Sequence, residues 1–597
     1  MRTGPAIVCS LFFSGVALGQ AAELNIIARQ GEPTPVPGRV FSGLLSATPI
    51  VDDSGRVWFN NDAGGRSLYR YTENAGQKVL QANETTAGGF TLFDGGVFGG
   101  DLSVNAAGQA VFVARLRPIP SGDTLFAIAR FDPAQGGPSG TLTLLSQPGD
   151  AAPVSDPVPV TISGYERTSD VLPIDSAGRT VFFASLEGDG LPNGDYALVR
   201  AGEGPLELVY RREQCVSFTN ASGCFDTTGA GSSLDITQLM GNATGGVAFG
   251  IRGLGGNDAL LVESDAESGM RLITTTFEPI INPKDPQTRY VQLGGTGSSF
   301  GYADDGSVSI TGLVDPPTRD ALVTFTPDSR EPFFNLFNGS QVPGLDTVSG
   351  EPNVVVHRNA HGDITLTGSV TTPSGQGDAV ITRQDGVYTI MGAPGTMFGD
   401  LTFRNTINAF AMNRAGQIAF NADVVIPGEG NGEALFFYDP ATGLHEIMRE
   451  GETIGAVDGV GGIRADLIEF LGAQNSGHRP VYADGLGDTG LVAFTVREGS
   501  NDSAVVTWQL TEASPCVPDI TTDGTNPGDA GFGDPDGAVT VSDLTFFVEA
   551  WLASDLGIAD VTTDGTNPGD AAFGTPDGAV TVSDLTFFVE AWLGGCP

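Results

Sequence analysis

The residues with the clearest potential for chemistry are aspartates near the C-terminus. From Cys516 onward the chain carries 14 acidic residues and neither Lys nor Arg. Aspartates in this segment recur at the same spacing 41 positions apart. Clustered carboxylates supply the oxygen ligands that Ca²⁺ prefers. The sequence therefore predicts two calcium sites, which would be formed by Asp519, Asp523, Asp536, Asp543 and by their counterparts Asp560, Asp564, Asp577, Asp584.

The stretch DGAVTVSDLTFFVEAWL occurs twice without a substitution, at 536–552 and 577–593. Its start resembles the latter half of an EF-hand calcium loop. Asp536 would be the ligand before the sharp turn at Gly537, and Asp543 would close the coordination from the first turn of the next helix.

The loop departs from the ordinary EF-hand in length. Asp519 and Asp543 lie 24 positions apart, whereas the first and last ligands of an ordinary loop are about 11 apart. The early ligand position could be filled by Asp523 or by Asp529. Asp534 is replaced by Thr575 in the second copy, so it is the least suited to be a ligand.

Each acidic loop is followed by an apolar pattern of helical spacing. Apolar residues recur at i, i+3, i+4, i+7 and i+8, which predicts one buried stripe on each of two helices. These stripes comprise Leu544, Phe547, Val548, Trp551, Leu552 and Leu585, Phe588, Val589, Trp592, Leu593. A folded helix pair is therefore expected rather than a disordered acidic tail, although the aspartates could also serve only to cap helices and turns.

Paired loops and helices of this kind resemble the dockerin modules, most closely the GC-type that ends secreted dockerin domain-anchored proteins. The resemblance covers about 80 residues. It implies calcium as cofactor and a cohesin-like or other surface receptor as partner. Exposed Thr545, Glu549, Thr586 and Glu590 would contact that receptor, which could dock on either copy. Recent duplication would produce the same identity without any function.

The N-terminus predicts export. Arg2 precedes an apolar run from Ala6 to Leu18, and small residues follow, so residues 1–21 are expected to be a signal peptide. The run is too short to span a membrane. We expect a secreted or surface-associated protein with disulfides Cys215–Cys224 and Cys516–Cys596, although four free thiols would also fit.

The formal net charge of −42 argues against nucleic acid or an anionic membrane surface as partner, because both would be repelled. Cations are the better partners for such a chain.

Residues 22–511 consist of repeats of one sequence unit. Its signal is Asx, two residues and Gly, followed by an apolar strand, where Asx caps the turn and Gly adopts a positive φ. Eight copies occur, six of them with the Asx: DDSGRVWF (52–59), NAAGQAVF (105–112), DSAGRTVF (175–182), NATGGVAF (242–249), ADDGSVSI (303–310), NAHGDITL (359–366), NRAGQIAF (413–420) and GDTGLVAF (487–494).

About four strands per unit and almost no helical periodicity predict a mainly β fold, namely an eight-bladed β-propeller, with the helical dockerin-like domain at 512–597. The last unit lacks its closing strand, which the segment 25–38 would supply from the N-terminus. Seven blades or two smaller β-domains remain alternatives, because the spacing of the units is uneven.

The body contains no recognisable catalytic motif. His357 and His361 fall in a turn, where their spacing favours no zinc pair. DSGRVW (53–58) resembles the Asp-box of sialidase-type propellers, but we favour a structural hairpin, because Val51 stands where the Asp-box has Ser or Thr and the other seven hairpins follow a different register.

We therefore favour a non-catalytic propeller that displays a binding surface and is attached through the dockerin-like module. The alternative is a propeller-type enzyme that acts on polysaccharide and is targeted by the same module. A cluster of carboxylates with a basic or aromatic partner in the central channel would favour the enzyme, and a channel lined by small apolar residues would favour the binding protein.

Overall fold

The structure is a computed structural model. It describes residues 22–594 except for 43–48, 62–66, 73–74, 82, 94–101, 120–121, 135–139, 157, 166–171, 190, 192–194, 212–235, 253–257, 264–269, 276–288, 294–299, 316–318, 327–332, 338–346, 357–363, 385–386, 455–461, 471–472, 475–484, 500–501, 511–540, 557 and 562–577. The expected signal peptide and all four cysteines of the expected disulfides lie outside the described residues.

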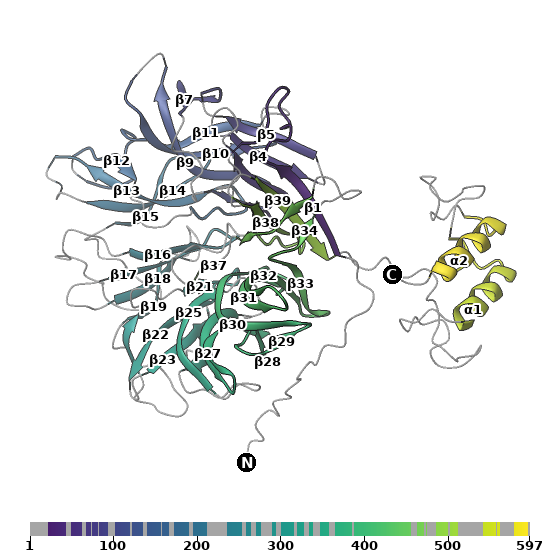
Figure 1. The fold of residues 1–597 in the computed structure, drawn as a ribbon. Helices are drawn as coiled ribbons and strands as arrows, with labels where there is room; N and C mark the ends of the chain where they lie inside the picture. The colour runs from purple at the N-terminus through teal and green to yellow at the C-terminus, as the bar shows by residue number, and fades with distance from the viewer. Residues whose placement is uncertain are drawn as a thin grey trace. The chain divides into compact units, whose positions relative to one another are not determined.

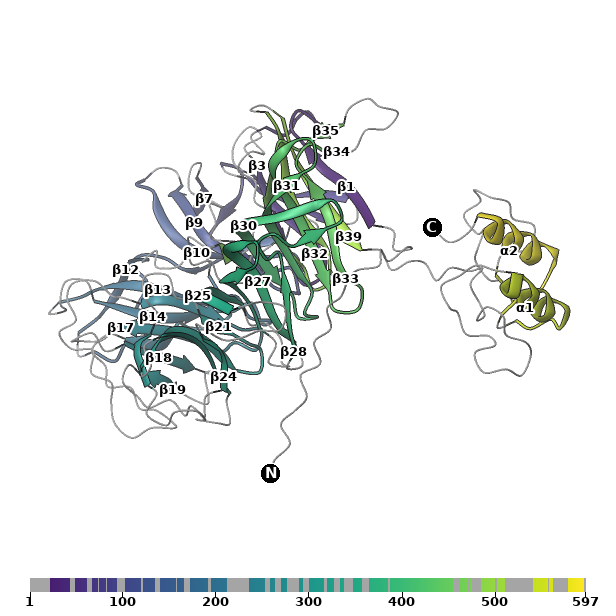
Figure 2. The ribbon, with the colours of Figure 1, turned by 60° about the horizontal axis from the view of Figure 1, so that its bottom comes forward.

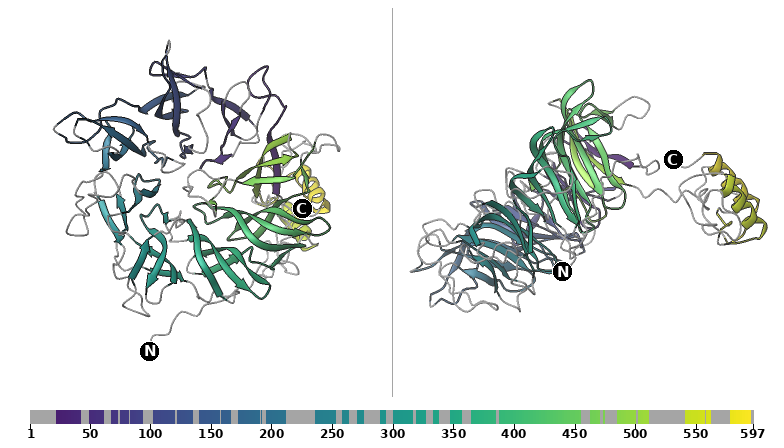
Figure 3. Two further views of the ribbon diagram at one scale, coloured as in Figure 1. Left: turned by 60° about the vertical axis from the view of Figure 1, so that its left-hand side comes forward. Right: turned by 90° about the horizontal axis from the view of Figure 1, so that it is seen from below.

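The chain divides into two compact units, one spanning Leu24–Trp508 and the other holding both helices. The first unit is a β-propeller, in which sheets are arranged around a central axis (Figures 1, 2 and 3). No helix among the described residues is long and apolar enough to cross a membrane.

The described residues form eight sheets of four to six strands and one of two strands. The first, in the order β2-β3-β4-β5, comprises β2 (Ile50–Val51), β3 (Val57–Asn61), β4 (Ser67–Thr72) and β5 (Ala75–Gln81). The second, β11-β10-β9-β7-β6 with β8 on β9, comprises β6 (Thr86–Ala87), β7 (Phe90–Leu92), β8 (Ser103–Val104), β9 (Ala110–Pro118), β10 (Leu125–Asp132) and β11 (Thr141–Ser146).

The next two sheets are four-stranded and follow the order of the chain. One comprises β12 (Thr161–Tyr165), β13 (Thr180–Glu187), β14 (Tyr196–Ala201) and β15 (Glu207–Arg211). The other comprises β16 (Ile236–Gly241), β17 (Val247–Arg252), β18 (Asp258–Glu263) and β19 (Met270–Thr275).

Two further sheets contain the middle of the repeat body. One, β20-β22-β23-β24 with β21 on β22, comprises β20 (Arg289–Leu293), β21 (Phe300–Tyr302), β22 (Val308–Asp315), β23 (Arg319–Phe325) and β24 (Phe333–Phe337). The other comprises β25 (Thr347–Val356), β26 (Ile364–Thr372), β27 (Gly375–Gln384) and β28 (Val387–Met391), in that order.

The last sheets contain the end of the body. A six-stranded sheet, β29-β30-β31-β32-β33 with β37 on β30, comprises β29 (Met397–Phe398), β30 (Leu401–Met412), β31 (Ile418–Ile426), β32 (Gly430–Asp439), β33 (Gly443–Arg449) and β37 (Ala473–Gln474). The two-stranded sheet pairs β34 (Thr453–Ile454) with β35 (Ile463–Arg464). The closing sheet, β1-β39-β38-β36, comprises β1 (Ala22–Arg29), β36 (Leu467–Phe470), β38 (Val492–Glu498) and β39 (Asp502–Leu510).

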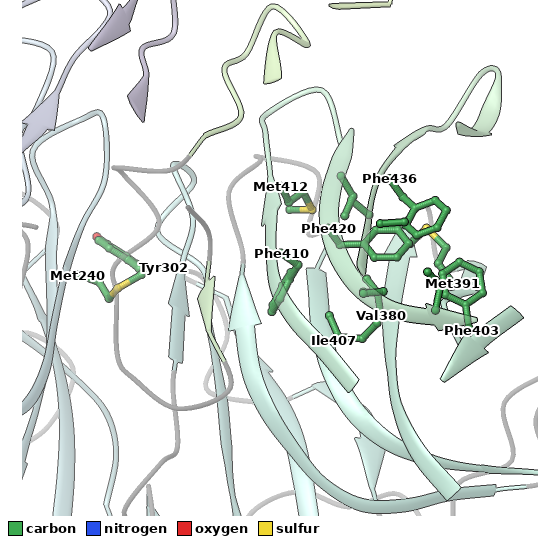
Figure 4. Close-up of a cluster of buried hydrophobic side chains, with 14 of the residues drawn as sticks. Met240, Tyr302, Val380, Met391, Phe403, Ile407, Phe410, Met412, Phe420 and Phe436 are labelled. Atoms are coloured by element: carbon green, nitrogen blue, oxygen red, sulfur yellow. The ribbon is translucent and has the colours of Figure 1, made fainter. Parts of the chain in front are cut away.

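The central strands are buried on both faces because each sheet lies between two neighbours. All six residues of β14 are buried. Aromatic side chains join neighbouring sheets, as where Phe437 of β32 meets Trp508 of β39 with ring centres 4.9 Å apart. Within one core cluster, Phe403, Phe420 and Phe436 pack face to face or tilted, as Figure 4 shows. Apolar burial on both sides of a strand is what keeps the sheets stacked.

The predicted closure by the N-terminus is confirmed. β1 lies beside β39 in the closing sheet. The Gln30 amide donates to the Ser503 carbonyl at 2.9 Å, and Arg29 forms an ion pair with Asp502 at 2.6 Å. The first and last strands of the body therefore share one sheet, so β39 is not an open edge.

Deleting residues 22–29 should therefore destabilise the first unit as a whole. The deletion removes a strand and leaves β39 as an unpaired edge, so we expect the melting temperature to fall by several degrees. Arg29→Gln, which removes only a partly exposed ion pair worth about 1 kcal/mol or less, should cause a smaller fall. Equal melting of the deletion and the intact chain by calorimetry would contradict closure by β1.

Candidate functional site

The Asx-Gly turns are uniform three-residue hairpin loops. Seven of the eight lie within the described residues, and the turn at 359–362 lies outside them. In each of the seven, the glycine amide donates to the carbonyl three residues before it, at 2.8–3.2 Å. The φ angles of these glycines lie between 74° and 94°, a range that residues with a Cβ resist. The predicted use of Gly at this position is confirmed.

Several described turns are hydrogen-bonded to the turn that follows them in the chain. Where the first residue of a described turn is Asn, it donates its side-chain amide to a carbonyl of the next turn. Asn105 Nδ2 donates to Asp175 O at 2.9 Å, and Asn413 Nδ2 donates to Gly487 O at 2.9 Å. Asn242 Nδ2 donates similarly to Ala303 O at 3.3 Å. We call this row of linked turns the turn belt.

Longer side chains reinforce the turn belt from the neighbouring sheet. Arg130 and Arg200 each donate to the glycine carbonyl of the following turn, at 3.2 Å. Arg271 donates to Gly306 O at 3.0 Å, and Gln384 donates to Gly416 O at 2.5 Å. Arg130 and Arg200 are 3% exposed, and each also pairs with a carboxylate, Arg130 with Glu203 at 3.2 Å and Arg200 with Glu207 at 3.7 Å.

Four charged side chains at the second position of their turns meet at one point. Arg414 Nε donates to Asp304 at 2.7 Å. Its Nη1 donates to Asp53 at 2.8 Å and to Asp488 at 2.6 Å. We call these four side chains the Arg414 cluster; Arg414 and Asp53 are 361 residues apart in the chain.

The carboxylates of the Arg414 cluster stabilise the positive charge of the Arg414 guanidinium. Burial disfavours the ionised guanidinium, but the carboxylates of Asp53, Asp488 and Asp304 outweigh it and raise the pKa of Arg414 above the ordinary value of arginine. All three carboxylates are bonded to one guanidinium. The geometry therefore binds the turns to one another, and it also leaves three carboxylates facing a single positive charge.

Sequence reasoning missed the Arg414 cluster. The signal was present, because the second turn residue is charged in four of the eight copies, at Asp53, Asp304, Arg414 and Asp488. Only the ring arrangement shows that these positions face each other.

The Asp-box-like stretch forms a structural hairpin, as one of the two sequence interpretations held. Asp52 Oδ1 accepts from the Ser54 and Arg56 amides, and Asp52 Oδ2 accepts from Trp58 Nε1 at 2.9 Å. Arg56 Nε adds an ion pair to Asp52 at 2.7 Å. The carboxylate of Asp52 is thus fully used in holding its own turn.

A second group of carboxylates comes from β31, from β32 and from the residue that follows β33. Asn408 Nδ2 donates to Asp423 and to Glu433 at 3.1 Å each. Glu450 accepts from the Glu433 amide at 3.0 Å. Burial is the largest influence on both glutamates, and together with neighbouring acids, including Asp423, it raises the pKa of Glu433 and of Glu450 above the ordinary value.

In the second unit, α1 (Val541–Leu552) and α2 (Val582–Gly594) pack against each other. Phe547 and Phe588 stack with ring centres 3.8 Å apart and planes 7° apart. Corresponding residues of the two helices have the same burial class from Val541 to Val548 and from Val582 to Val589. Among the described side chains the predicted stripe is wrong at Leu552, which is 71% exposed where the first helix ends.

The receptor-binding candidates lie on these helices. Thr545, Glu549 and Thr586 are exposed. The hydroxyl groups of Thr545 and Thr586 donate to the Val541 and Val582 carbonyls, at 2.9 Å in both helices. The side chain of Glu590 lies outside the described residues.

Three of the eight predicted calcium ligands are described, namely Asp543, Asp560 and Asp584. Asp543 and Asp584 are fully buried. Asp584 accepts from the Val561 amide at 2.8 Å and from the Thr581 amide at 2.7 Å. It therefore caps the start of α2 and ties the start of the loop to its end.

Two of the four predicted calcium ligands of the second loop, Asp560 and Asp584, are among the described residues. Asp560, the first predicted ligand, accepts from the Gly578 amide at 2.7 Å. Asp584, the last predicted ligand, accepts from the Thr581 amide. Both ligands therefore contact residues 578–581, although 24 positions separate them in the chain. Hard carboxylate oxygens are the ligands that Ca²⁺ requires. In the part of the chain that the structure describes, no group of three or more His, Cys, Asp or Glu side chains could hold a metal; Asp519, Asp523, Asp536, Asp564 and Asp577 lie outside it.

Comparison with protein families matches residues 9–310 and 294–498 to a family of unknown function, DUF7453. The two matches together cover most of the chain. The chain belongs to this family. The family description assigns no activity, and no curated protein matches the chain.

Among solved structures, dipeptidyl peptidase 4 from Porphyromonas gingivalis matches with a TM-score of 0.37 and 10% identity, over 78% of this chain and 58% of that one. The β-propeller domain of the Trilobed protease from Pyrococcus furiosus matches with a TM-score of 0.34 and 10% identity, over 70% and 98%. Prolyl oligopeptidase B from Galerina marginata gives 0.35 and 11%, over 77% and 56%. The chain thus spans less than two thirds of the two complete peptidases, and similarity at this level says nothing about its activity.

Replacing Arg414 should destabilise the first unit strongly. Arg414→Gln leaves three neighbouring carboxylates without their cation, so we expect a loss of about 2–4 kcal/mol in the free energy of unfolding, measured by urea titration. Arg464→Gln is the matched control, because Arg464 is 53% exposed and its nearest carboxylates are 3.7 and 3.9 Å away. Equal effects of the two substitutions would contradict a structural role for the cluster.

Removing the charge of Glu450 should stabilise the fold at neutral pH. The pKa of Glu450 is raised on folding, mainly because burial disfavours the ionised carboxylate. The stability that the protonated side chain contributes is therefore fully present below the ordinary pKa of 4.5 and is lost as the pH rises through the raised pKa. Glu450→Gln should therefore melt higher than the unaltered chain near pH 7 and equally near pH 4. Exposed Glu187→Gln serves as control, and a lower melting point of Glu450→Gln at both pH values would overturn the assignment.

Proposed function

We propose that the chain is an exported, non-catalytic binding protein. Its propeller displays a ligand-binding surface, and a calcium-dependent dockerin-like module attaches it to a cohesin-like or other surface receptor. In this proposal residues 1–21 are removed on export, and Cys215–Cys224 and Cys516–Cys596 are disulfides. Eight of the sheets act as the blades of the ring.

The observation that carries this proposal is the helix pair. Two identical helices pack through stacked Phe547 and Phe588, so each presents the same exposed surface. Val541 and Val582 are 67% and 68% exposed, and Thr545 and Thr586 are exposed beside them. The same exposed residues on two equivalent helices would let one partner dock on either copy.

The turn belt supports a scaffold role for the propeller. Hydrogen bonds between successive turns fix the inner ends of the sheets, and the Arg414 cluster uses its charges within the protein. Such a ring is a rigid support for binding loops. The eight-blade count is supported by the eight sheets of four or more strands.

One observation favours the enzymatic alternative. Three aspartates with a basic partner are the constellation that we expected of a polysaccharide-degrading propeller. General acid catalysis needs a protonated carboxyl group near its substrate, whereas all three of these carboxylates are bonded to Arg414. Asp53→Asn and Asp488→Asn would separate the readings, because loss of polysaccharide cleavage in a folded variant would establish the enzyme.

Chelation should unfold the second unit and leave the propeller intact. Without metal, the carboxylates of each acidic loop repel one another. The free energy of metal binding therefore contributes directly to the free energy of folding. We expect EGTA to abolish the helical circular dichroism of α1 and α2 while the sheet signal stays, more clearly under reducing conditions, where Cys516–Cys596 could not hold the ends together.

Substitutions make the calcium test specific. Asp543→Ala with Asp584→Ala should mimic chelation, whereas Asp534→Thr, which copies the residue of the second loop, should have little effect. Because Asp584 also caps α2, the deciding measurement is calorimetry of the unaltered chain. If it shows no saturable Ca²⁺ binding at millimolar metal, the calcium proposal is wrong.

Receptor attachment has its own test. Thr545→Arg and Thr586→Arg place a bulky charge on equivalent faces. Since either copy could dock, each single variant should still capture the receptor from the producing cell's surface in the presence of calcium, and the double variant should lose it. Capture by the double variant would show that these faces are not the attachment surface.

A further inference from the structure

The β9–β10 hairpin is buried at one end and exposed at the other. Its inner part is covered, since Val111 and Ile128 belong to a core cluster shared with β12–β14. Toward the hairpin tip the same face becomes accessible. Phe126 is 41% exposed and Ile119 is 54% exposed.

Two arginines on this face stack on one aromatic ring. The guanidinium carbon of Arg117 lies 3.6 Å from the ring centre of Phe93, and that of Arg115 lies 5.0 Å from it. Phe93 is held in place because its amide donates to the Arg115 carbonyl at 2.8 Å. A stacked guanidinium keeps its N–H edge available for a ligand.

Strand register places Phe126 in the same row. Arg115 and Phe126 are direct partners in the antiparallel β9–β10 pair, so their side chains lie on one face. Arg117 follows two residues after Arg115 and therefore points the same way. Two guanidinium groups thus lie beside an accessible aromatic ring.

The charge of this face differs from that of the whole chain. In a protein of net charge −42, arginines are mostly bonded to acids. Among the described residues, neither Arg115 nor Arg117 has a carboxylate within ion-pairing distance, and the Arg115 Nε atom is buried without a hydrogen-bond acceptor. The two side chains are therefore cations oriented by an aromatic ring rather than by ion pairs.

The ligand must satisfy both the cations and the accessible ring. A guanidinium pairs with a carboxylate through two parallel hydrogen bonds, and an aromatic face packs against the C–H face of a sugar ring. A long polyanion such as nucleic acid would be repelled by the rest of the protein. A short saccharide that carries carboxylates meets both demands and limits the repulsion.

We propose that Phe93, Arg115, Arg117 and Phe126 form a binding site for an acidic oligosaccharide of the uronic acid class. The site extends the proposed binding function of the propeller by naming its ligand. It involves no residue of the second unit, so failure of the calcium or receptor tests would leave it standing.

Calorimetric titration of the full chain with a galacturonic acid trimer tests the site. Saturable binding is expected for the acid form and loss of binding for its methyl ester, which has the same rings without the charges. Arg115→Gln with Arg117→Gln should weaken binding by roughly tenfold or more, and Phe126→Ala should weaken it as well. Added salt should weaken it further.

The control is Arg464→Gln, which removes an exposed arginine elsewhere on the propeller and should leave binding unchanged. Unaltered melting of each variant would show that the fold is retained. Equal binding of acid and ester, unchanged binding by the double arginine variant, or binding of a phosphoserine peptide in preference to the trimer would overturn the proposal.

Discussion

The structure depends on a backbone constraint repeated around the ring. Each inner turn needs a residue at positive φ, and glycine adopts that conformation without steric cost. Once the turn is formed, one of its carbonyls accepts a hydrogen bond from the preceding turn, as Asp175 O does from Asn105. A substitution at one glycine would therefore disturb two turns. The Arg414 cluster then joins turns that are not neighbours in the chain.

Much of the architecture could be predicted because its signals are local. The turn pattern appears in the sequence, and the missing strand of the last unit has its counterpart near the N-terminus, where β1 was found beside β39. The Arg414 cluster could not be predicted, since contacts 110 and 361 residues apart depend on the number and tilt of the sheets. The site at Arg115 and Arg117 was missed for a similar reason, because its register and its aromatic partner come from separate strands.

The helix pair shows where periodicity reaches its limit. The spacing rule placed Leu552 with Phe547 on a buried stripe, but the first helix ends there and Leu552 faces solvent. Ala550 is buried instead. Among the predicted ligands, Asp584 combines a possible metal role with helix capping, since both of its oxygens accept backbone hydrogen bonds. One residue can serve both roles, so the sequence alone could not separate them.

The central claim is that the linked turns make the propeller one cooperative body. Hydrogen exchange of the full chain, followed by mass spectrometry, tests it most directly. The account predicts that the glycine amides of the described turns, from Gly55 to Gly490, exchange at one common slow rate near that of global unfolding. If the turns exchanged at separate rates, with some as fast as the exposed loops, the sheets would open independently and the claim would be wrong.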